Sequence, residues 1–540
     1  MSLSQRATSF EVPASSGDES SNTNASSSRN YHKPPVVKSE LSSDLAWSER
    51  NLLSLDGGGI RGYWTLLVLQ QLMKYIANEE LKRKDDDDEH HSFFPSQFPE
   101  HVTQGKDDED ERRKQQAAPG ARVFTWEYVR EARKFLPCHY FDYICGSSTG
   151  ALIAIMLGRF RMPVWDCLRE YEKMSHSIFG KPRLVSQRNI GIVRWPKYSS
   201  TALEEAFQEV TARRGERTAR SIDNVTFPSP PGICKTFVTA FAYERRRNAP
   251  VSEMRLYLLR TYEHERREGL ILRGKRRTNT GTFNEENRNY GSADNWPIWR
   301  VARAATAAPM YFKELAEKRN VLQGKTTIYF SDGGFGHTNN PTFEGVTEIK
   351  ALHGNKSLGA VVNVGTSRKK LKPGGKSIFK RVHTSFDRVT DPKYVAEKVA
   401  ALELSAYWRF NDENGIGVDL DEWEPNGYFS KHPGAKTLET IETKFNKWAM
   451  DGDNNKHLRD CAKELVARRR ARARNVAKWE VYATNASFAC IHDDCRNTPF
   501  AERTALEDHI RRDHATSESE VQSMVKRATK MWQYQIPHRS

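Results

Sequence analysis

The sequence predicts an α/β protein that carries a nucleophile elbow and is followed by a helical region and a small zinc-finger module. Short apolar segments end in glycine- or aspartate-rich turns within 51–62, 141–150 and 327–334. The first two turns lead into residues with helical spacing of apolar side chains, which is the order of a parallel sheet covered by helices. Two cysteines and two histidines then follow within 490–514.

The size and charge of the chain limit the classes of protein to consider. Its 540 residues are enough for one large domain with appendages. The formal net charge of +15 favours an anionic partner, either a phospholipid surface or nucleic acid. Seven cysteines without a repeating framework, and a polar start without an apolar signal segment, indicate an intracellular protein. No run approaches the ~20 apolar residues that span a bilayer. We therefore expect a cytoplasmic location with peripheral membrane contact, and a nuclear location is the alternative.

Two segments lack the apolar content of a packed core. Residues 1–48 are rich in serine, asparagine, glutamate and proline, and we expect a disordered tail there. Residues 82–119 contain the acidic runs 85–89 and 107–111. Those runs lack the spaced glycine and terminal glutamate of a calcium loop, so we interpret the segment as a solvated insertion in a domain of residues 49–385.

A glycine-rich turn follows the first predicted strand, 51–55. Successive glycine N–H groups can converge on one anion, and the positive end of the following helix reinforces them. An oxyanion hole needs such fixed donors. Its expected members are Gly57, Gly58, Gly59, Arg61 and Gly62. The same letters fit a dinucleotide-binding loop, but the position of its acidic residue, about 20 residues on, holds a basic run instead.

The segment G-S-S-T-G after the strand at 141–145 has the pattern of a nucleophile elbow. The register puts Ser148 at the tip of the turn and leaves Ser147 as the weaker candidate. Gly146 and Gly150 flank the tip, where the backbone comes too close for a Cβ atom. A serine is a weak nucleophile unless a base takes its proton, so a partner is required.

The third turn supplies the partner, because the predicted strand 327–331 delivers Asp332, Gly333 and Gly334. Carboxyl ends of strands meet at one edge of such a sheet, so we expect this aspartate beside the elbow. A carboxylate with a pKa of about 4 is a poor base at neutral pH, and burial would raise its basicity. His337 could suggest a triad, but we interpret it as a loop histidine.

These motifs resemble those of the patatin-like phospholipase family. The matching pieces are S-L-D-G-G-G-I-R-G, G-S-S-T-G, A-R-A-A-T-A-A-P, D-G-G and N-N-P, within residues 52–382. The resemblance implies a three-layer α/β sandwich and a Ser–Asp dyad, with Ser148 as nucleophile and Asp332 as proton acceptor. It also implies an oxyanion region at the glycine-rich turn, no catalytic cofactor and calcium-independent hydrolysis of acyl lipids.

Residues 386–484 are expected to be helical, with amphipathic spacing at 395–408 and 438–449 and a further stretch at 458–479. The last of these contains the basic run Arg468–Arg474. We expect a solvated helix face there, and nucleic acid, anionic lipid or an import receptor are alternative partners.

Residues 485–516 resemble a C2H2 zinc finger, with a tail at 517–540. The expected zinc ligands are Cys490, Cys495, His509 and His514, while Phe500 and Leu506 would fill the small core. Such a module could contact nucleic acid or protein.

We therefore expect a calcium-independent phospholipase A-type lipid acyl hydrolase that acts on phospholipids at a membrane surface. The alternative is a zinc-finger regulatory protein, binding nucleic acid or protein, on a patatin-like scaffold with weak hydrolysis.

Overall fold

The computed structural model describes residues 41–82, 135–180, 197–214, 221–246, 251–264, 289–309, 311–321, 324–334, 337–367, 393–425, 433–515 and 517–530. The expected disordered tail up to residue 40 and the charged insertion after residue 82 lie outside these residues.

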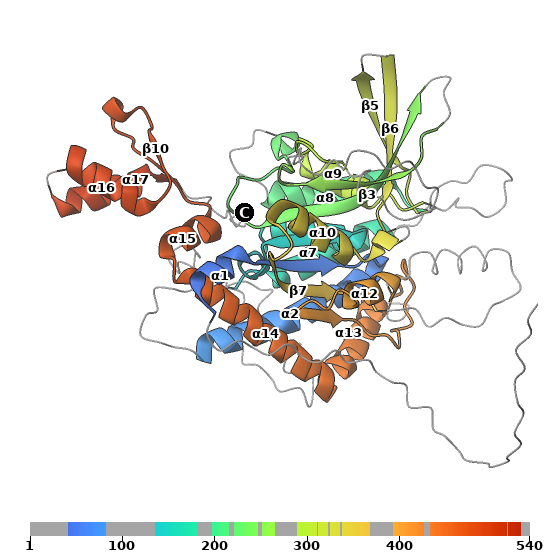
Figure 1. Cartoon of the computed structure of the whole chain (residues 1–540). Coiled ribbons are helices and arrows are strands. Elements are labelled where there is room, and N and C mark those ends of the chain that lie inside the picture. The colour runs from blue at the N-terminus through green and yellow to red at the C-terminus, as the bar shows by residue number, and fades with distance from the viewer. Residues whose placement is uncertain are drawn as a thin grey trace, which may run out of the picture. The chain divides into compact units, whose positions relative to one another are not determined.

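An eight-stranded sheet forms the centre of the described chain, with strand order β5-β6-β3-β2-β1-β7-β8 and β4 paired to β3 (Figure 1). The strands from β3 through β8 in this order are parallel, whereas β4, β5 and β6 join by antiparallel pairing. Their bounds are β1 Arg50–Leu55, β2 Tyr143–Ser147, β3 Lys235–Arg246, β4 Arg255–Arg260, β5 Leu315–Val321, β6 Gly324–Asp332, β7 Leu358–Val364 and β8 Tyr407–Phe410.

Helices cover both faces of this sheet. The helices are α1 Ser43–Ser48, α2 Gly62–Lys82, α5 Pro137–Tyr140, α6 Thr149–Ala154, α7 Val164–Phe179, α8 Ser200–Arg214, α9 Ile298–Ala305, α10 Thr342–His353, α12 Lys393–Ala400, α13 Ala435–Met450, α14 Gly452–Ala473 and α15 Val476–Thr484. Leu53 and Leu55 of β1 point into the larger core with α2, while Leu52 points into a second core with α10. The predicted three-layer α/β sandwich is therefore confirmed.

The register of β3 brings two distant strand ends together. Thr239 pairs with Ser147 of β2, and the next residue, Ala240, pairs with Asp332 of β6. Because β4 occupies the other edge of β3 at both positions, β2 and β6 must lie end to end along one edge. The elbow that follows β2 thus meets the carboxyl end of β6.

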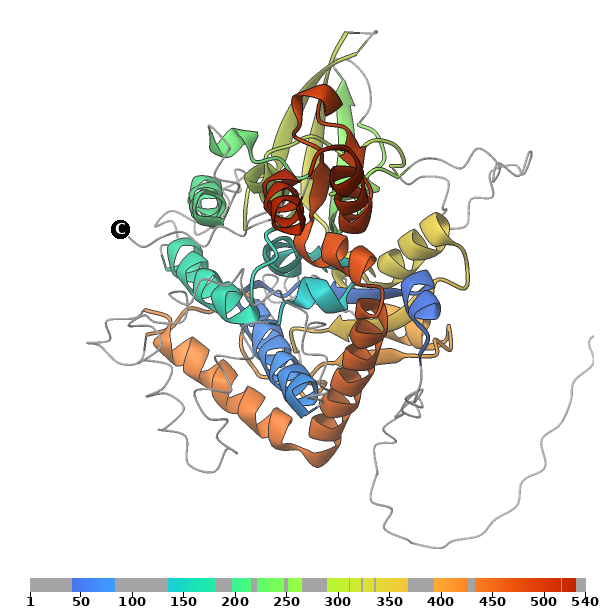
Figure 2. The ribbon, with the colours of Figure 1, turned by 90° about the vertical axis from the view of Figure 1, so that its left-hand side faces the viewer.

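The C-terminal region belongs to the same domain as the central sheet. The expected domain boundary at residue 385 would have separated the two. The helix expected at 395–408 is wrong in its second half, because α12 ends at Ala400 and Tyr407–Phe410 forms β8 beside β7. In β8, Trp408 and Phe410 are buried and alternate with half-buried residues, which is the period of a strand. Figure 2 shows α2 flanked by α13 and α14, which pack against it.

The basic run on α14 is largely buried, which corrects the expectation of a solvated face. Arg468, Arg469 and Arg472 are each at most 4% exposed. Arg469 and Arg470 both pair with Glu80 of α2, at 2.6 and 2.8 Å. A buried arginine needs such acidic partners. Because these partners come from distant segments, helical spacing alone does not show whether the run is buried or exposed.

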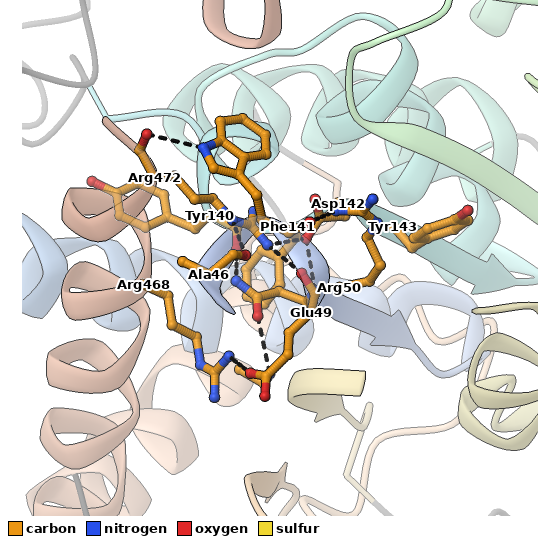
Figure 3. A network of polar contacts seen from close by, with 12 residues as sticks. Ala46, Glu49, Arg50, Tyr140, Phe141, Asp142, Tyr143, Arg468 and Arg472 are labelled. Atoms are coloured by element: carbon orange, nitrogen blue, oxygen red, sulfur yellow. Dashed lines mark hydrogen bonds and ion pairs between the residues drawn. The ribbon is translucent and has the colours of Figure 1, made fainter. Parts of the chain in front are cut away.

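Figure 3 shows the part of this network that ties α14 to the start of the sheet. Arg472 Nη2 donates to Asp142 Oδ2, directly before β2, at 2.7 Å. The same carboxylate oxygen accepts from the Asn51 N–H of β1 at 2.7 Å. Arg468 pairs with Glu49, directly before β1. These ion pairs join the beginnings of the two central strands to one helix.

Helix α1 also belongs to the folded domain, so the expected tail ends earlier than residue 48. The Ser42 side chain accepts from the Leu45 N–H and begins the helix. Trp47 is buried against Tyr482 of α15, with ring centroids 5.5 Å apart, and its Nε1–H donates to the Arg472 carbonyl at 3.1 Å.

A small C-terminal module has its own core and a three-stranded sheet of order β10-β9-β11. Its elements are β9 Ser487–Ala489, β10 Pro499–Phe500, α16 Arg503–Asp513, α17 Glu518–Ala528 and β11 Thr529–Lys530. Val521 and Val525 of α17 pack with Leu506 of α16. The module therefore extends into the segment expected to be a tail after residue 516.

Candidate active site and metal centre

Ser148 lies on a strained turn between β2 and α6. Its φ of 52° and ψ of −126° are rare for a residue with a side chain. The two flanking glycines permit the turn, because a Cβ on Gly146 would overlap the Gly150 backbone and a Cβ on Gly150 would overlap the carbonyl oxygen of Leu55. Ser147 is instead fully buried within β2. The geometry at Ser148 is that of a nucleophile elbow.

Asp332 meets this serine directly. Ser148 Oγ donates to Asp332 Oδ2 at 2.7 Å, and the Gly334 N–H donates to Asp332 Oδ1 at 2.6 Å. A Cβ on Gly333 would overlap Thr239 of β3, so the turn after β6 also requires glycine. His337 is exposed and packs against Tyr394, with ring centroids 4.6 Å apart.

Burial makes this aspartate a stronger base than an ordinary carboxylate. The side chain is 3% exposed, and loss of solvation raises its pKa from 3.8 to about 6. The hydrogen bonds from Ser148 and Gly334 oppose part of that rise. A carboxylate with this pKa is still ionised near neutral pH and takes up a proton more readily than one at 3.8.

The glycine loop before α2 lies beside Ser148, since a Cβ on Gly57 would come within 2.9 Å of Ser148 Cβ. The carbonyl oxygens of this loop are turned into the protein. Thr366 Oγ1 donates to the Gly57 carbonyl at 3.1 Å, and Tyr171 donates from its hydroxyl to the Gly59 carbonyl at 2.6 Å. Fixed peptide planes of this kind are what a preorganised oxyanion hole requires.

The amides of the loop differ in their surroundings. The Gly57 N–H donates to the Asn339 carbonyl at 3.0 Å and so is used by the fold. The Gly58 N–H donates to Oγ1 of Thr149, the residue directly after Ser148, at 3.2 Å. Arg61 bonds to the Gly58 carbonyl through its backbone N–H and through Nε, at 3.1 and 3.4 Å. The loop thus presents Gly58, rather than Gly57, toward the elbow.

Gly59 is held by the C-terminal region. Its φ of +57° favours glycine, and a Cβ there would overlap the Leu420 carbonyl oxygen. The same carbonyl accepts the Ile60 N–H at 2.7 Å. On the other side of the loop, a Cβ on Gly62 would overlap the Tyr171 hydroxyl. Both positions therefore require glycine for close packing.

Several residues that hold the loop had no clear motif in the sequence. Asn339 belongs to the N-N-P piece, whereas Tyr171, Thr366 and Leu420 lie in segments whose spacing indicated only secondary structure. Arg409 of β8 is also unforeseen, and it donates to Asp56 Oδ2 at 3.1 Å. Their contribution depends on which segments pack together, which spacing along the chain does not specify.

The parallel-rich sheet, the elbow and the direct Ser–Asp hydrogen bond are features of a patatin-type fold. A family model described as patatin-like phospholipase matches residues 120–345. The chain therefore contains a patatin-like phospholipase domain. The glycine loop at 56–62 precedes the matched range, yet the structure places it beside Ser148.

Curated relatives agree with this assignment. Calcium-independent phospholipase A2-gamma of Oryctolagus cuniculus is 27% identical over 322 residues, which are 58% of this chain and 36% of that protein. The Homo sapiens protein of the same name is 27% identical over 294 residues, 53% of this chain and 32% of that protein. Phospholipase A I of Arabidopsis thaliana is 21% identical over 328 residues, 54% and 23% of the two chains. The matched part spans about a third or less of these relatives.

The C-terminal module brings together the four side chains expected to bind metal. Ligand atoms of Cys490, Cys495, His509 and His514 all lie within 4.8 Å of one another. Cys495 Sγ is 3.3 and 3.1 Å from the Nε2 atoms of His509 and His514. Ligand atoms around a tetrahedral zinc ion are roughly 3.3–3.8 Å apart, so the cluster has the size that zinc needs.

A carboxylate contacts one of the four residues, His509, through the ring nitrogen that does not face the cluster. His509 Nδ1 lies 2.8 Å from Asp513 Oδ2, one helical turn later on α16. Such a partner keeps the proton on Nδ1 and leaves Nε2 for the metal. Leu506 and Phe488 are buried in the core of the module, while Phe500 is partly buried and stacks on His509 at 4.9 Å. The residues present therefore fit a zinc ion.

Proposed function

We propose that the protein is a phospholipase A-type lipid acyl hydrolase, and the hydrogen bond of 2.7 Å between Ser148 Oγ and Asp332 Oδ2 carries this proposal. Asp332 is buried and its pKa is raised to about 6, as a carboxylate that accepts a serine proton requires. The relatives named as phospholipases support acyl lipids, and phospholipids in particular, as substrates.

In the proposed reaction, Asp332 takes the proton of Ser148 while Oγ attacks the ester carbonyl carbon. The carbonyl oxygen becomes negative in the tetrahedral intermediate, and N–H groups of the glycine loop, including that of Gly58, which is directed at the elbow, stabilise it. The intermediate collapses, the proton passes to the leaving alkoxide, and an acyl-serine remains. Water then attacks the acyl-serine with Asp332 again as base, which releases the fatty acid.

We infer that this reaction needs no calcium. The residues that act on the ester in the mechanism are the dyad and the glycine loop, and the mammalian relatives are named calcium-independent. Hydrolysis should therefore persist in excess EDTA. Activity that is lost in EDTA and restored by calcium would contradict the proposal.

Fatty-acid release from mixed phospholipid vesicles tests the function itself. We expect Ser148→Ala to lower kcat by about 10³ or more. Ser147→Ala is the matched control, because its hydroxyl is buried one residue before the elbow and takes no part in the reaction. Loss of activity in the control variant, or hydrolysis that survives Ser148→Ala, would reject the assigned nucleophile.

We further propose that the cluster of Cys490, Cys495, His509 and His514 binds structural zinc, with no part in hydrolysis. The proposed setting is a peripheral membrane surface within the cell. No helix in the described parts of the chain is long and apolar enough to cross a bilayer. Among the residues that the structure describes, no specific contact favours the alternative of a zinc-finger regulatory protein, whereas the Ser–Asp hydrogen bond supports the hydrolase.

A further inference from the structure

The antiparallel end of the sheet carries a surface that the proposed reaction does not explain. Beyond Thr239, the last residue paired with β2, β3 continues from Ala240 to Arg246 along β6, which pairs in turn with β5. We call these three outer segments the ribbon, and they extend together beyond the parallel strands (Figure 1). Because Asp332 lies at its inner end, the ribbon begins beside the candidate dyad.

One face of the ribbon is aromatic and basic. Tyr243 lies opposite Tyr329 in the register, and their rings stack with centroids 5.2 Å apart. The Arg245 guanidinium lies 5.5 Å from the centroid of the Tyr329 ring. Arg245 and Lys318 both pair with Thr327, so they lie on the same face as Tyr329, and both are exposed.

The other face of the ribbon is covered by protein. Phe330 is fully buried there, 5.0 Å from the ring of Trp296 and 5.3 Å from that of Tyr257. Helix α9 packs against β3 and β6. The aromatic and basic face is therefore the one that remains available to a partner.

The segment before β4 adds apolar side chains to the same end of the sheet. Ser252 lies against the outer part of β3, since its N–H donates to the Glu244 carbonyl at 3.0 Å and its Oγ accepts from the Glu244 N–H at 2.6 Å. On either side of it, Val251 and Met254 are 49% and 52% exposed. Exposed apolar side chains beside basic ones are typical of proteins that adsorb to a bilayer.

We propose that this ribbon surface, made up of Tyr243, Arg245, Val251, Met254 and Lys318, docks the protein on an anionic phospholipid bilayer. The inference rests on the proposed function, because it names the surface through which the hydrolase meets its substrate. Val251 and Met254 enter the acyl boundary, while the basic side chains contact anionic headgroups.

The acidic groups nearby do not cancel the charge of this surface. Glu253 is exposed between the two apolar residues, but Glu314 is half-buried and accepts the Tyr243 hydroxyl at 2.6 Å. Glu317 is half-buried and pairs with Arg300. The exposed side chains are thus mainly basic and apolar. A nucleic acid would use the basic side chains and leave the apolar ones in water, so a bilayer fits better.

Flotation of the full chain with phosphatidylcholine vesicles, with and without phosphatidylserine, tests this surface. The Ser148→Ala background removes hydrolysis from the measurement. Each basic side chain at an anionic surface raises partitioning by about fivefold. Arg245→Gln combined with Lys318→Gln should therefore lower partitioning onto the phosphatidylserine-containing vesicles by about 25-fold. Val251→Ser with Met254→Ser should lower it by about tenfold on either vesicle.

Exposed residues of α13 provide matched controls. Lys444→Gln with Lys447→Gln removes two exposed charges, and Met450→Ser removes a methionine that is 60% exposed. We expect these controls to float like the parent. Ribbon variants that float like the parent would overturn the proposal. Control variants that lose as much vesicle binding as the ribbon variants would overturn it too. So would ribbon variants that lose only binding to a DNA duplex.

With Ser148 restored, the ribbon variants should lose hydrolysis of phosphatidylserine-containing vesicles but keep that of a water-soluble short-chain ester. Equal loss on both substrates would mean that the ribbon acts on the dyad rather than on docking, and would overturn the proposal. Flotation without any hydrolysis by the restored protein would instead contradict the proposed function and leave the docking surface supported.

Discussion

Arg409 of β8 donates a hydrogen bond from Nη1 to Oδ2 of Asp56 at 3.1 Å, directly before the glycine loop. Asp56 is fully buried, and Asn363 Nδ2 donates to its other oxygen at 2.8 Å. Burial raises the pKa of Asp56, while the charge of Arg409 lowers it. A strand that lies well after the matched range of residues 120–345 thus fixes the start of the loop.

Arg409→Met should therefore impair catalysis, although the Arg409 side chain acts through Asp56 and not on the substrate. Loss of the cation leaves Asp56 buried without its charged partner, and the loop should shift. We expect kcat for a water-soluble ester to fall by about 10², with a smaller change in KM, because a displacement of about 1 Å can cost that much. Glu413→Gln is the control, since this glutamate is exposed and its ion pair with Arg409 is long, at 3.8 Å. Equal effects of both changes would argue against positioning through Asp56.

The pH dependence of hydrolysis should report the burial of Asp332. The base acts in its ionised form, and its pKa is raised to about 6. The rate on a water-soluble ester should then be constant well above pH 6 and fall about tenfold for each unit below it. Steady-state kcat/KM between pH 4.5 and 8 measures this, and a profile that stays flat to pH 4.5 would show that burial does not raise the pKa.

Gly59→Ala should disrupt the loop for two reasons. The residue has a φ of +57°, and the added Cβ would overlap the Leu420 carbonyl oxygen. We expect kcat to fall by about 10² to 10³ as the donors move away from the oxyanion. Gly452→Ala is the control, because a Cβ at the start of α14 meets open space. Full activity in Gly59→Ala would exclude a role for this loop geometry.

The parts of the site that the sequence predicted are those built from continuous segments. A strand, a glycine-flanked turn and a helix specify the position of Ser148 by local sterics alone, and Asp332 follows from the rule that strand ends meet. The contact between them needed one more fact, the end-to-end placement of β2 and β6 along β3, which the structure supplies.

The parts that the sequence did not predict depend on long-range packing. The run at Arg468–Arg474 has the composition of a solvated face, yet its burial is decided by Glu49, Glu80 and Asp142, which lie hundreds of residues earlier. Likewise β8 is too short to distinguish from the end of a helix until β7 pairs with it.

In the C-terminal module, Asp513→Asn should weaken zinc binding although the residue is not a ligand. Asp513 Oδ2 lies 2.8 Å from His509 Nδ1, and loss of such a carboxylate lowers metal affinity by about 10- to 100-fold. Asp508→Asn is the matched control, because this exposed carboxylate of α16 pairs with Arg511 at the surface. Competition with a chromophoric chelator measures the affinity, and equal affinities for the two variants would contradict the role of Asp513.

The two ends of the arginine run should differ in their effect on stability. Arg472 is buried and holds Asp142 at 2.7 Å, whereas Arg474 is exposed and donates only to the Leu41 carbonyl among the contacts described for it. Arg472→Met leaves a buried carboxylate without its cation, which should lower the free energy of unfolding by about 3–5 kcal/mol. Arg474→Met should change it little. The shift of the urea midpoint at constant slope measures both. Helix α14 joins the starts of β1 and β2. A small shift for Arg472→Met would therefore mean that other contacts hold these strands, and that this network has no major part in stabilising the sheet.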